Sequence, residues 1–190
     1  MLARALDAGV HAGWVTADHI YGGAYRLRAL LEDRRMRYVV GVASNQAMTV
    51  GFAPARIDAL LGELPEDAWT QISCGDGAKG PRRYDWAAVR LNCPVEGGER
   101  WALGRRSISD AGEYAYYLAF DPAGTALEEV VRIAGRRWTI ERAFEEVKGE
   151  VGLDEYEVRS WTGWYRHITL AMWTYALLAV LRAGAMAVEA

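Results

Sequence analysis

The chain has 190 residues, 52% of them hydrophobic, and a formal net charge of −3. This length and hydrophobic content suffice for one domain with a sizeable core. The slightly acidic balance excludes an overall basic surface of the kind that announces nucleic-acid binding, so only local basic strips remain for that role.

Two cysteines, Cys74 and Cys93, are the only ones in the sequence, and neither lies in a Cys-x-x-Cys pair. This excludes the usual zinc-binding pattern and predicts a reduced, cytoplasmic chain. The N-terminal segment MLARALDAGVHAGW has no long apolar core, so it is not a secretory signal. The apolar run from Ile168 to Leu181 is 14 residues long, which is too short to span a bilayer, so we expect a buried helix and no membrane partner.

The first quarter of the chain predicts a strand, a helix and a second strand. After a short helix at residues 1–9, a compact apolar run at 14–17 indicates a buried strand, and Asp18 follows it directly. Residues 24–35 have helical spacing. The β-branched segment YVVGVAS, 38–44, is typical of a parallel strand buried on both faces. We therefore expect a βαβ unit with a parallel pair.

The middle of the chain predicts an antiparallel β insertion at about 66–121, after a short helix near 55–62. Its apolar strands are expected near residues 69–73, 84–92, 100–106 and 114–120. The segment GDGAKG, 75–80, lacks the Gly-Lys-Ser/Thr ending of a phosphate-binding loop, so we interpret it as a turn between two strands.

The last third predicts two long helices, from about 125 to 152 and from about 160 to 182. No repeat or linker interrupts the sequence, so residues 1–190 are expected to form a single domain.

The segment RRWTIERAFEEVKGEVG, 136–152, places one carboxylate and two cations on one side of the first of these helices. Relative to Glu141, Arg137 lies about 40° away and Lys148 about 20° away around the helix axis. The centre of the apolar stripe lies about 90° from Glu141. The three charged residues form either a salt-bridged border or half of an active site. The apolar stripe consists of Ile133, Ile140, Phe144, Val147 and Val151.

Three basic clusters offer local contacts for a nucleic acid, although solvated faces explain most such runs. They are Arg34, Arg35 and Arg37; Lys79, Arg82 and Arg83; and Arg132, Arg136 and Arg137.

Two carboxylates, Asp18 and Glu141, fall where two-metal phosphoryl-transfer sites place theirs, at a strand end and on a helix edge. Two Mg²⁺ ions about 4 Å apart need oxygen ligands from separated elements. A nearby Lys and Arg would hold the phosphate backbone of the substrate. The structural alternatives are a helix N-cap for Asp18 and a helical ion pair for Arg137 and Glu141.

Four segments in order resemble the DDE transposases of bacterial insertion sequences, in the branch whose last motif is Tyr-x2-Arg-x3-Glu-x6-Lys. They are WVTADHIYGG, GDGAKGPRRYDWAAVRL, RRSISDAGEYAYYLAF and RRWTIERAFEEVKGEVGLDEYEVRSWTGWYRHITLAM. The resemblance makes Asp18 and Glu141 catalytic metal ligands, and Arg137 and Lys148 DNA-binding residues. The Tyr of the motif falls on Ala134, which is a departure from the pattern.

The resemblance implies an RNase H-like α/β core with an antiparallel β insertion and two long C-terminal helices. Against that family the chain begins at the first helix, so we expect a C-terminal fragment that lacks the leading strands and the first catalytic Asp. The parent reaction is metal-dependent DNA cleavage and strand transfer with Mg²⁺ or Mn²⁺, and we expect this fragment to be inactive. DNA at the transposon ends is the implied partner, a homodimer is compatible with it, and no small-molecule cofactor is implied. The alternative is a non-catalytic DNA-binding or interaction remnant.

A functional site makes a geometric prediction that a salt-bridged border does not. The long helix would pack beside the strand 14–17 and bring Glu141 within roughly 8 Å of Asp18, since both carboxylates would bind ions about 4 Å apart. Both would stay partly exposed, and Ile140, Phe144 and Val147 would be buried against the sheet.

Overall fold

The computed structural model describes residues 2–77, 80–110, 112–157 and 159–188. The chain divides into two compact units, residues 1–137 and residues 138–190. The first unit is an α/β assembly, and the second consists of helices.

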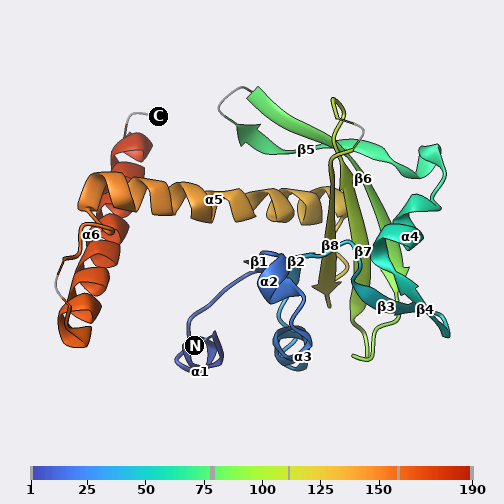
Figure 1. The fold of residues 1–190 in the computed structure, drawn as a ribbon, viewed down its shortest axis with the longest axis horizontal. Helices are drawn as coiled ribbons and strands as arrows, with labels where there is room; N and C mark the ends of the chain where they lie inside the picture. Colours follow the sequence, from blue (N-terminus) through green and yellow to red (C-terminus); the bar gives the residue numbers. More distant parts are fainter. Residues whose placement is uncertain (1, 78–79, 111, 158, 189–190) are drawn as a thin grey trace. The chain divides into compact units, whose positions relative to one another are not determined.

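The first unit is built on a six-stranded mixed sheet with the strand order β1-β2-β8-β7-β6-β5 (Figure 1). The β1–β2 pair is parallel, and the other neighbours are antiparallel. The predicted parallel pair and the predicted antiparallel strands are therefore confirmed. Because β8 pairs with β2, the insertion extends the same sheet instead of forming a separate one. The strands are β1 (Val15–Ala17), β2 (Tyr38–Val42), β5 (Thr70–Gly77), β6 (Gly80–Leu91), β7 (Glu99–Arg106) and β8 (Tyr114–Asp121).

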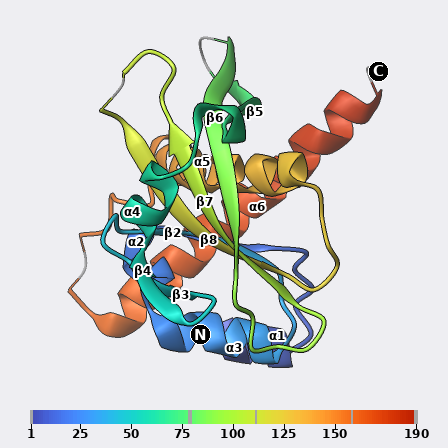
Figure 2. The same cartoon turned by 90° about the vertical axis from the view of Figure 1, so that its right-hand side faces the viewer.

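One face of this sheet is covered by α3 (Tyr25–Asp33), by α4 (Ile57–Gly62) and by a short β hairpin (Figure 2). Leu31 of α3 and Ile57 of α4 are fully buried there against Tyr38, Val40 and Phe120 of the sheet. Side chains alternate along a strand, so Tyr38 and Val40 face these helices while Val39 faces the other side.

The opposite face is covered by the beginning of α5 (Leu127–Val151). Val131 of this helix is fully buried in one cluster with Val39 and Trp86. Gly135 allows the close approach, because a Cβ there would overlap the backbone carbonyl of Cys74 in β5. The first eleven residues of α5 therefore belong to the first unit by packing.

Three short elements of the first unit were not predicted, whereas α1 (Leu2–Asp7) confirms the expected N-terminal helix. They are α2 (His19–Gly22), the hairpin of β3 (Ala47–Val50) with β4 (Ala53–Arg56), and a 3-10 helix (Glu66–Ala68). The hairpin turns at Gly51, whose φ is +60°. Each helix or strand among them has at most four residues, which is too short to produce a periodic pattern in the sequence.

The second unit contains the rest of α5 and α6 (Trp161–Val188), which were both predicted as helices. The hydroxyl of Tyr175 donates a hydrogen bond to Glu146 at 2.8 Å, and the His167 ring lies 3.0 Å from the carbonyl of Gly152. Val147 and Ala171 are buried in this unit.

Two predictions of burial are wrong. Ile140 and Phe144 were expected to be buried but are 56% and 45% exposed. Val147 is buried as predicted, and its packing against the sheet stays a prediction. Helix α6 is almost entirely exposed, although we expected a buried helix. Its 25 residues Trp161–Ala185, with a mean hydropathy of 1.5, are long and apolar enough to cross a membrane by length and composition alone. We expected an apolar segment of only 14 residues. The apolar segment is longer because the helix includes Trp164 and Tyr165 and carries apolar side chains on all sides.

Candidate active site

Asp18 occupies the end of β1, where the chain turns into the four-residue helix α2. Its side chain caps this helix, accepting hydrogen bonds from the backbone N–H groups of Ile20 at 3.0 Å and Tyr21 at 3.2 Å. The structural interpretation of Asp18 as an N-cap is thus confirmed. The carboxylate remains partly exposed, beside the exposed side chains of Ile20 and Tyr21, so the cap does not bury it.

The other three predicted residues lie on α5. Arg137 and Glu141 are partly exposed, and Lys148 is exposed. The helical spacing of the three is as predicted. Arg137 ends the first unit, while Glu141 and Lys148 belong to the second. The predicted approach of Glu141 to Asp18, which belongs to the first unit, stays a prediction.

The donor atoms of these residues decide whether they fit a divalent metal ion. Carboxylate oxygens are ligands that Mg²⁺ accepts, and Asp18 presents a partly exposed carboxylate at a fixed strand end, so it fits as one ligand. Among the described residues, no three His, Cys, Asp or Glu side chains form a group that could hold a metal ion. Asp18 and Glu141 belong to different units, so a metal site formed by both stays a prediction.

The first basic cluster is committed to contacts within the protein. Arg34 forms an ion pair with Asp7 at 2.8 Å. Arg35 donates to the carbonyl of Glu96 at 3.0 Å. Arg37 donates to a backbone carbonyl and stacks over the ring of Trp14 at 4.9 Å. These three residues therefore serve the fold through contacts within the protein.

The second and third clusters differ in their exposure. Arg82 lies under α5, where it donates to the carbonyls of Cys74 and Gly135, and Arg83 is exposed. Lys79 lies outside the described residues. Arg132 and Arg136 are both exposed on α5. Each of the clusters 34–37 and 132–137 thus has two exposed arginines and one that is partly exposed.

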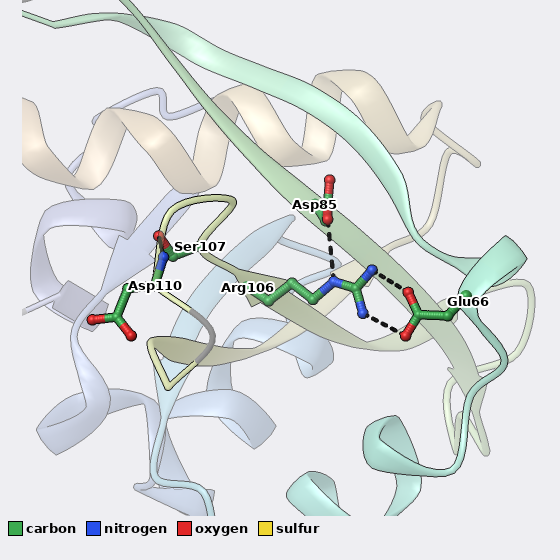
Figure 3. Close-up of polar contacts among 5 residues, drawn as sticks. All are labelled: Glu66, Asp85, Arg106, Ser107 and Asp110. Carbon is green, nitrogen blue, oxygen red and sulfur yellow. Dashed lines mark hydrogen bonds and ion pairs between the residues drawn. The ribbon is translucent and has the colours of Figure 1, made fainter.

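A network that the sequence did not reveal lies at the end of strand β7, where it pairs with β6 (Figure 3). The guanidinium of Arg106 binds both oxygens of Glu66, at 3.0 and 2.5 Å, and donates to Asp85 at 3.2 Å. The hydrogen bond to Glu66 raises the pKa of Arg106, and the same bond lowers the pKa of Glu66. Arg106 also stacks over Trp69 at 4.6 Å, so it fastens the 3-10 helix to the sheet.

A second unpredicted group is buried around Glu32, near the end of α3. Glu32 is 3% exposed and accepts a hydrogen bond from the hydroxyl of Tyr38 at 2.6 Å and from Arg100 at 2.8 Å. Burial and the hydrogen bond to Glu32 both raise the pKa of Tyr38. A cavity of about 460 Å³ opens beside this group and is lined by Arg28 and Arg100 among others. A buried Glu with a partner 68 residues away leaves no local signal in the sequence.

Comparison with protein families identifies the class of protein. The model of the family described as "Transposase DDE domain" matches residues 1–177, and the chain belongs to this family. A comparison with curated proteins gives no match. The family acts on DNA and normally uses a divalent metal. The matched range includes Asp18, Arg137, Glu141 and Lys148, while the narrower branch with the Tyr-Arg-Glu-Lys motif stays a prediction.

Proposed function

We propose that the chain is a DNA-binding transposase domain whose parent reaction is metal-dependent cleavage and transfer of DNA strands. The observation that carries the proposal is the family match over residues 1–177. Asp18, directly after a strand of a parallel pair, agrees with it. This arrangement, with helices on both faces of the sheet, also supports an RNase H-like core for the first unit.

The charges of the four predicted site residues suggest their roles. Asp18 and Glu141 would hold the metal, which when bound would activate a water or a 3′-hydroxyl for attack on phosphate. The two backbone N–H groups that bind Asp18 fix the direction of its carboxylate before any ligand arrives. Arg137 and Lys148 would position the DNA phosphates.

DNA binding is proposed to rest on phosphate contacts. Arg132 and Arg136 are exposed on the same helix as Arg137 and Lys148, so α5 carries cations along much of its length. Phosphate contacts release counterions, so affinity should fall steeply with salt and depend little on DNA sequence.

We expect the isolated chain to lack measurable strand transfer. Two-metal chemistry needs several ligands, and a misplaced metal costs orders of magnitude in rate. The described residues bring no group of three metal-binding side chains together. The exposed cations Arg132 and Arg136 of α5 support the second candidate function, which is non-catalytic DNA binding. A homodimer and a cytoplasmic location remain part of the proposal.

A gel-shift assay paired with nicking of supercoiled DNA in Mn²⁺ separates these functions. Salt-sensitive binding without nicking would support the non-catalytic form of the domain. Nicking that disappears in Asp18→Asn would establish catalysis and overturn our expectation of inactivity. Absence of DNA binding at low salt would overturn the proposal as a whole.

Arg137→Ala and Lys148→Ala locate the binding surface. Each should weaken DNA binding and lower the slope of log affinity against log salt by about 1. Arg142→Ala is the matched control, because Arg142 is a cation of the same helix that already pairs with Glu146 at 3.3 Å. Equal losses in all three variants would mean that only total charge matters.

A further inference from the structure

Gly22, the last residue of α2, packs directly against strand β2. It is buried, and a Cβ at this position would overlap the carbonyl oxygen of Gly41. Any side chain would therefore push α2 away from β2. The neighbouring Gly23 has a looser environment, where a Cβ would lie 3.2 Å from the carbonyl oxygen of His19.

Gly41 makes the matching contact from inside β2. A Cβ there would lie 3.3 Å from the backbone nitrogen of His19 and 3.5 Å from the carbonyl carbon of Asp18. The first distance is tight and the second is an ordinary van der Waals contact, so the turn that follows Asp18 lies against the strand at backbone level. A glycine in the middle of a β-branched strand marks such a close approach.

Arg28 of α3 holds the same turn from the other side. Its guanidinium donates a hydrogen bond to the carbonyl of Gly22. The N–H of Gly22 in turn donates to the carbonyl of Asp18 at 2.8 Å. The N–H and the carbonyl of Gly22 are thus both hydrogen-bonded, and its Cα packs against β2.

We propose that Gly22, Gly41 and Arg28 form a clamp that positions the Asp18 carboxylate. Helix α2 has four residues, fewer than a helix needs to persist without tertiary support. The two N–H groups that orient Asp18 belong to α2, so they keep their positions only while the clamp holds the helix on β2. The functional value of the clamp rests on the proposed role of Asp18 as a metal ligand, but its geometry does not.

The first experiment measures amide exchange with solvent by NMR at Ile20 and Tyr21, the two donors to Asp18. Arg28→Met should raise exchange at both amides about tenfold, because a hydrogen bond from a charged donor is lost. Arg28→Lys should restore part of the protection. Arg26→Met is the matched control, since Arg26 is an exposed arginine of the same helix, and it should change neither amide.

The second arm tests the backbone contact. Gly22→Ala should raise exchange at Ile20 and Tyr21, whereas Gly23→Ala should leave it near the wild-type rate. A general loss of stability would instead raise exchange equally at amides of β2 such as Val40. Should Gly22→Ala fail to fold, the Arg28 series still decides the matter. Unchanged exchange in Arg28→Met, or equal increases in the Arg26 control, would overturn the clamp.

A Mn²⁺ titration of the same variants separates the clamp from the proposed function. If Asp18 holds metal, Arg28→Met should weaken Mn²⁺ binding at Asp18 about 10-fold, as changes behind a metal ligand do. If Mn²⁺ still broadens the nearby amide resonances in Asp18→Asn, the metal role of Asp18 is refuted. This outcome would leave the exchange result to decide the clamp.

Discussion

Glu32 and Asp18 are two carboxylates of the same α/β unit, and their surroundings differ in every respect. Glu32 is 3% exposed, and charged and hydroxyl side chains, Arg100 and Tyr38, occupy its oxygens. Asp18 is partly exposed and accepts hydrogen bonds from two backbone N–H groups of its own turn. The first carboxylate is enclosed by the fold, and the second is presented by it.

This difference in exposure indicates that Glu32 contributes to stability, whereas Asp18 is available for function. A buried charge that loses its partner is expensive, so Glu32 and Arg100 must act as a pair for the fold to persist. A carboxylate held by backbone groups at the surface has a fixed direction and stays accessible to a ligand. Substitutions around Glu32 should therefore lower the stability of the fold, whereas substitutions of Asp18 should mainly remove metal binding.

The largest effect is expected for Arg100→Met. This variant leaves the Glu32 carboxylate buried without its cation and should lower the free energy of unfolding by about 3–5 kcal/mol. Arg90→Met is the control, because Arg90 forms an exposed pair with Glu99 at 2.9 Å, and it should cost less than about 1 kcal/mol. Urea denaturation of both variants measures the difference. Equal stabilities would remove the distinction between the two regions.

A moderate effect is expected at Asp18. Asp18→Ala removes the N-cap and should cost about 1 kcal/mol, whereas Asp18→Asn keeps the cap and should be almost neutral. Metal-dependent changes, such as Mn²⁺ broadening of nearby amides, should vanish in both variants. A loss of stability in Asp18→Asn as large as that in Arg100→Met would place Asp18 with the structural carboxylates.

A pH effect is expected at Asp121, a third carboxylate that is buried like Glu32. Burial raises the pKa of Asp121, but hydrogen bonds from Thr125 and Ala123 outweigh burial and lower it overall. The folded pKa is therefore below the unfolded value of about 3.9, so this contribution to stability is present above that pH and is lost as the pH falls through the folded pKa. Asp121→Asn should flatten the loss of stability below pH 4 in urea titrations. An unchanged slope would exclude Asp121 as its source.

The smallest effect on folding is expected for Glu66→Gln in the exposed network around Arg106. Arg106 keeps Asp85 at 3.2 Å and the ring of Trp69, so the variant should melt close to the wild-type temperature. Calorimetry at low and high salt measures this. A loss comparable to that of Arg100→Met would show that exposure does not govern these ion pairs.

Most elements of the fold could be predicted from the sequence, because their signals are local. The β-branched run at 38–42 gave β2, and helical spacing gave α3 and α5. Asp18 was placed correctly at a strand end, and Arg137, Glu141 and Lys148 on one helix. The exposure of Ile140 and Phe144 could not be predicted, since periodicity gives an apolar side of a helix but not the surface that covers it.

The sequence by itself determined the order of the elements and the position of Asp18 after β1, since these depend on residues a few positions apart. The parallel pair followed from the order strand, helix, strand. Only the tertiary structure decided which distant groups meet. Arg100 reaches Glu32 across 68 residues, and β8 returns to pair with β2. The contact of Gly22 with Gly41 belongs to the same class, although both glycines are visible in the sequence. Such contacts depend on how strands align after long connections, and the residues between them carry no periodic record of that alignment.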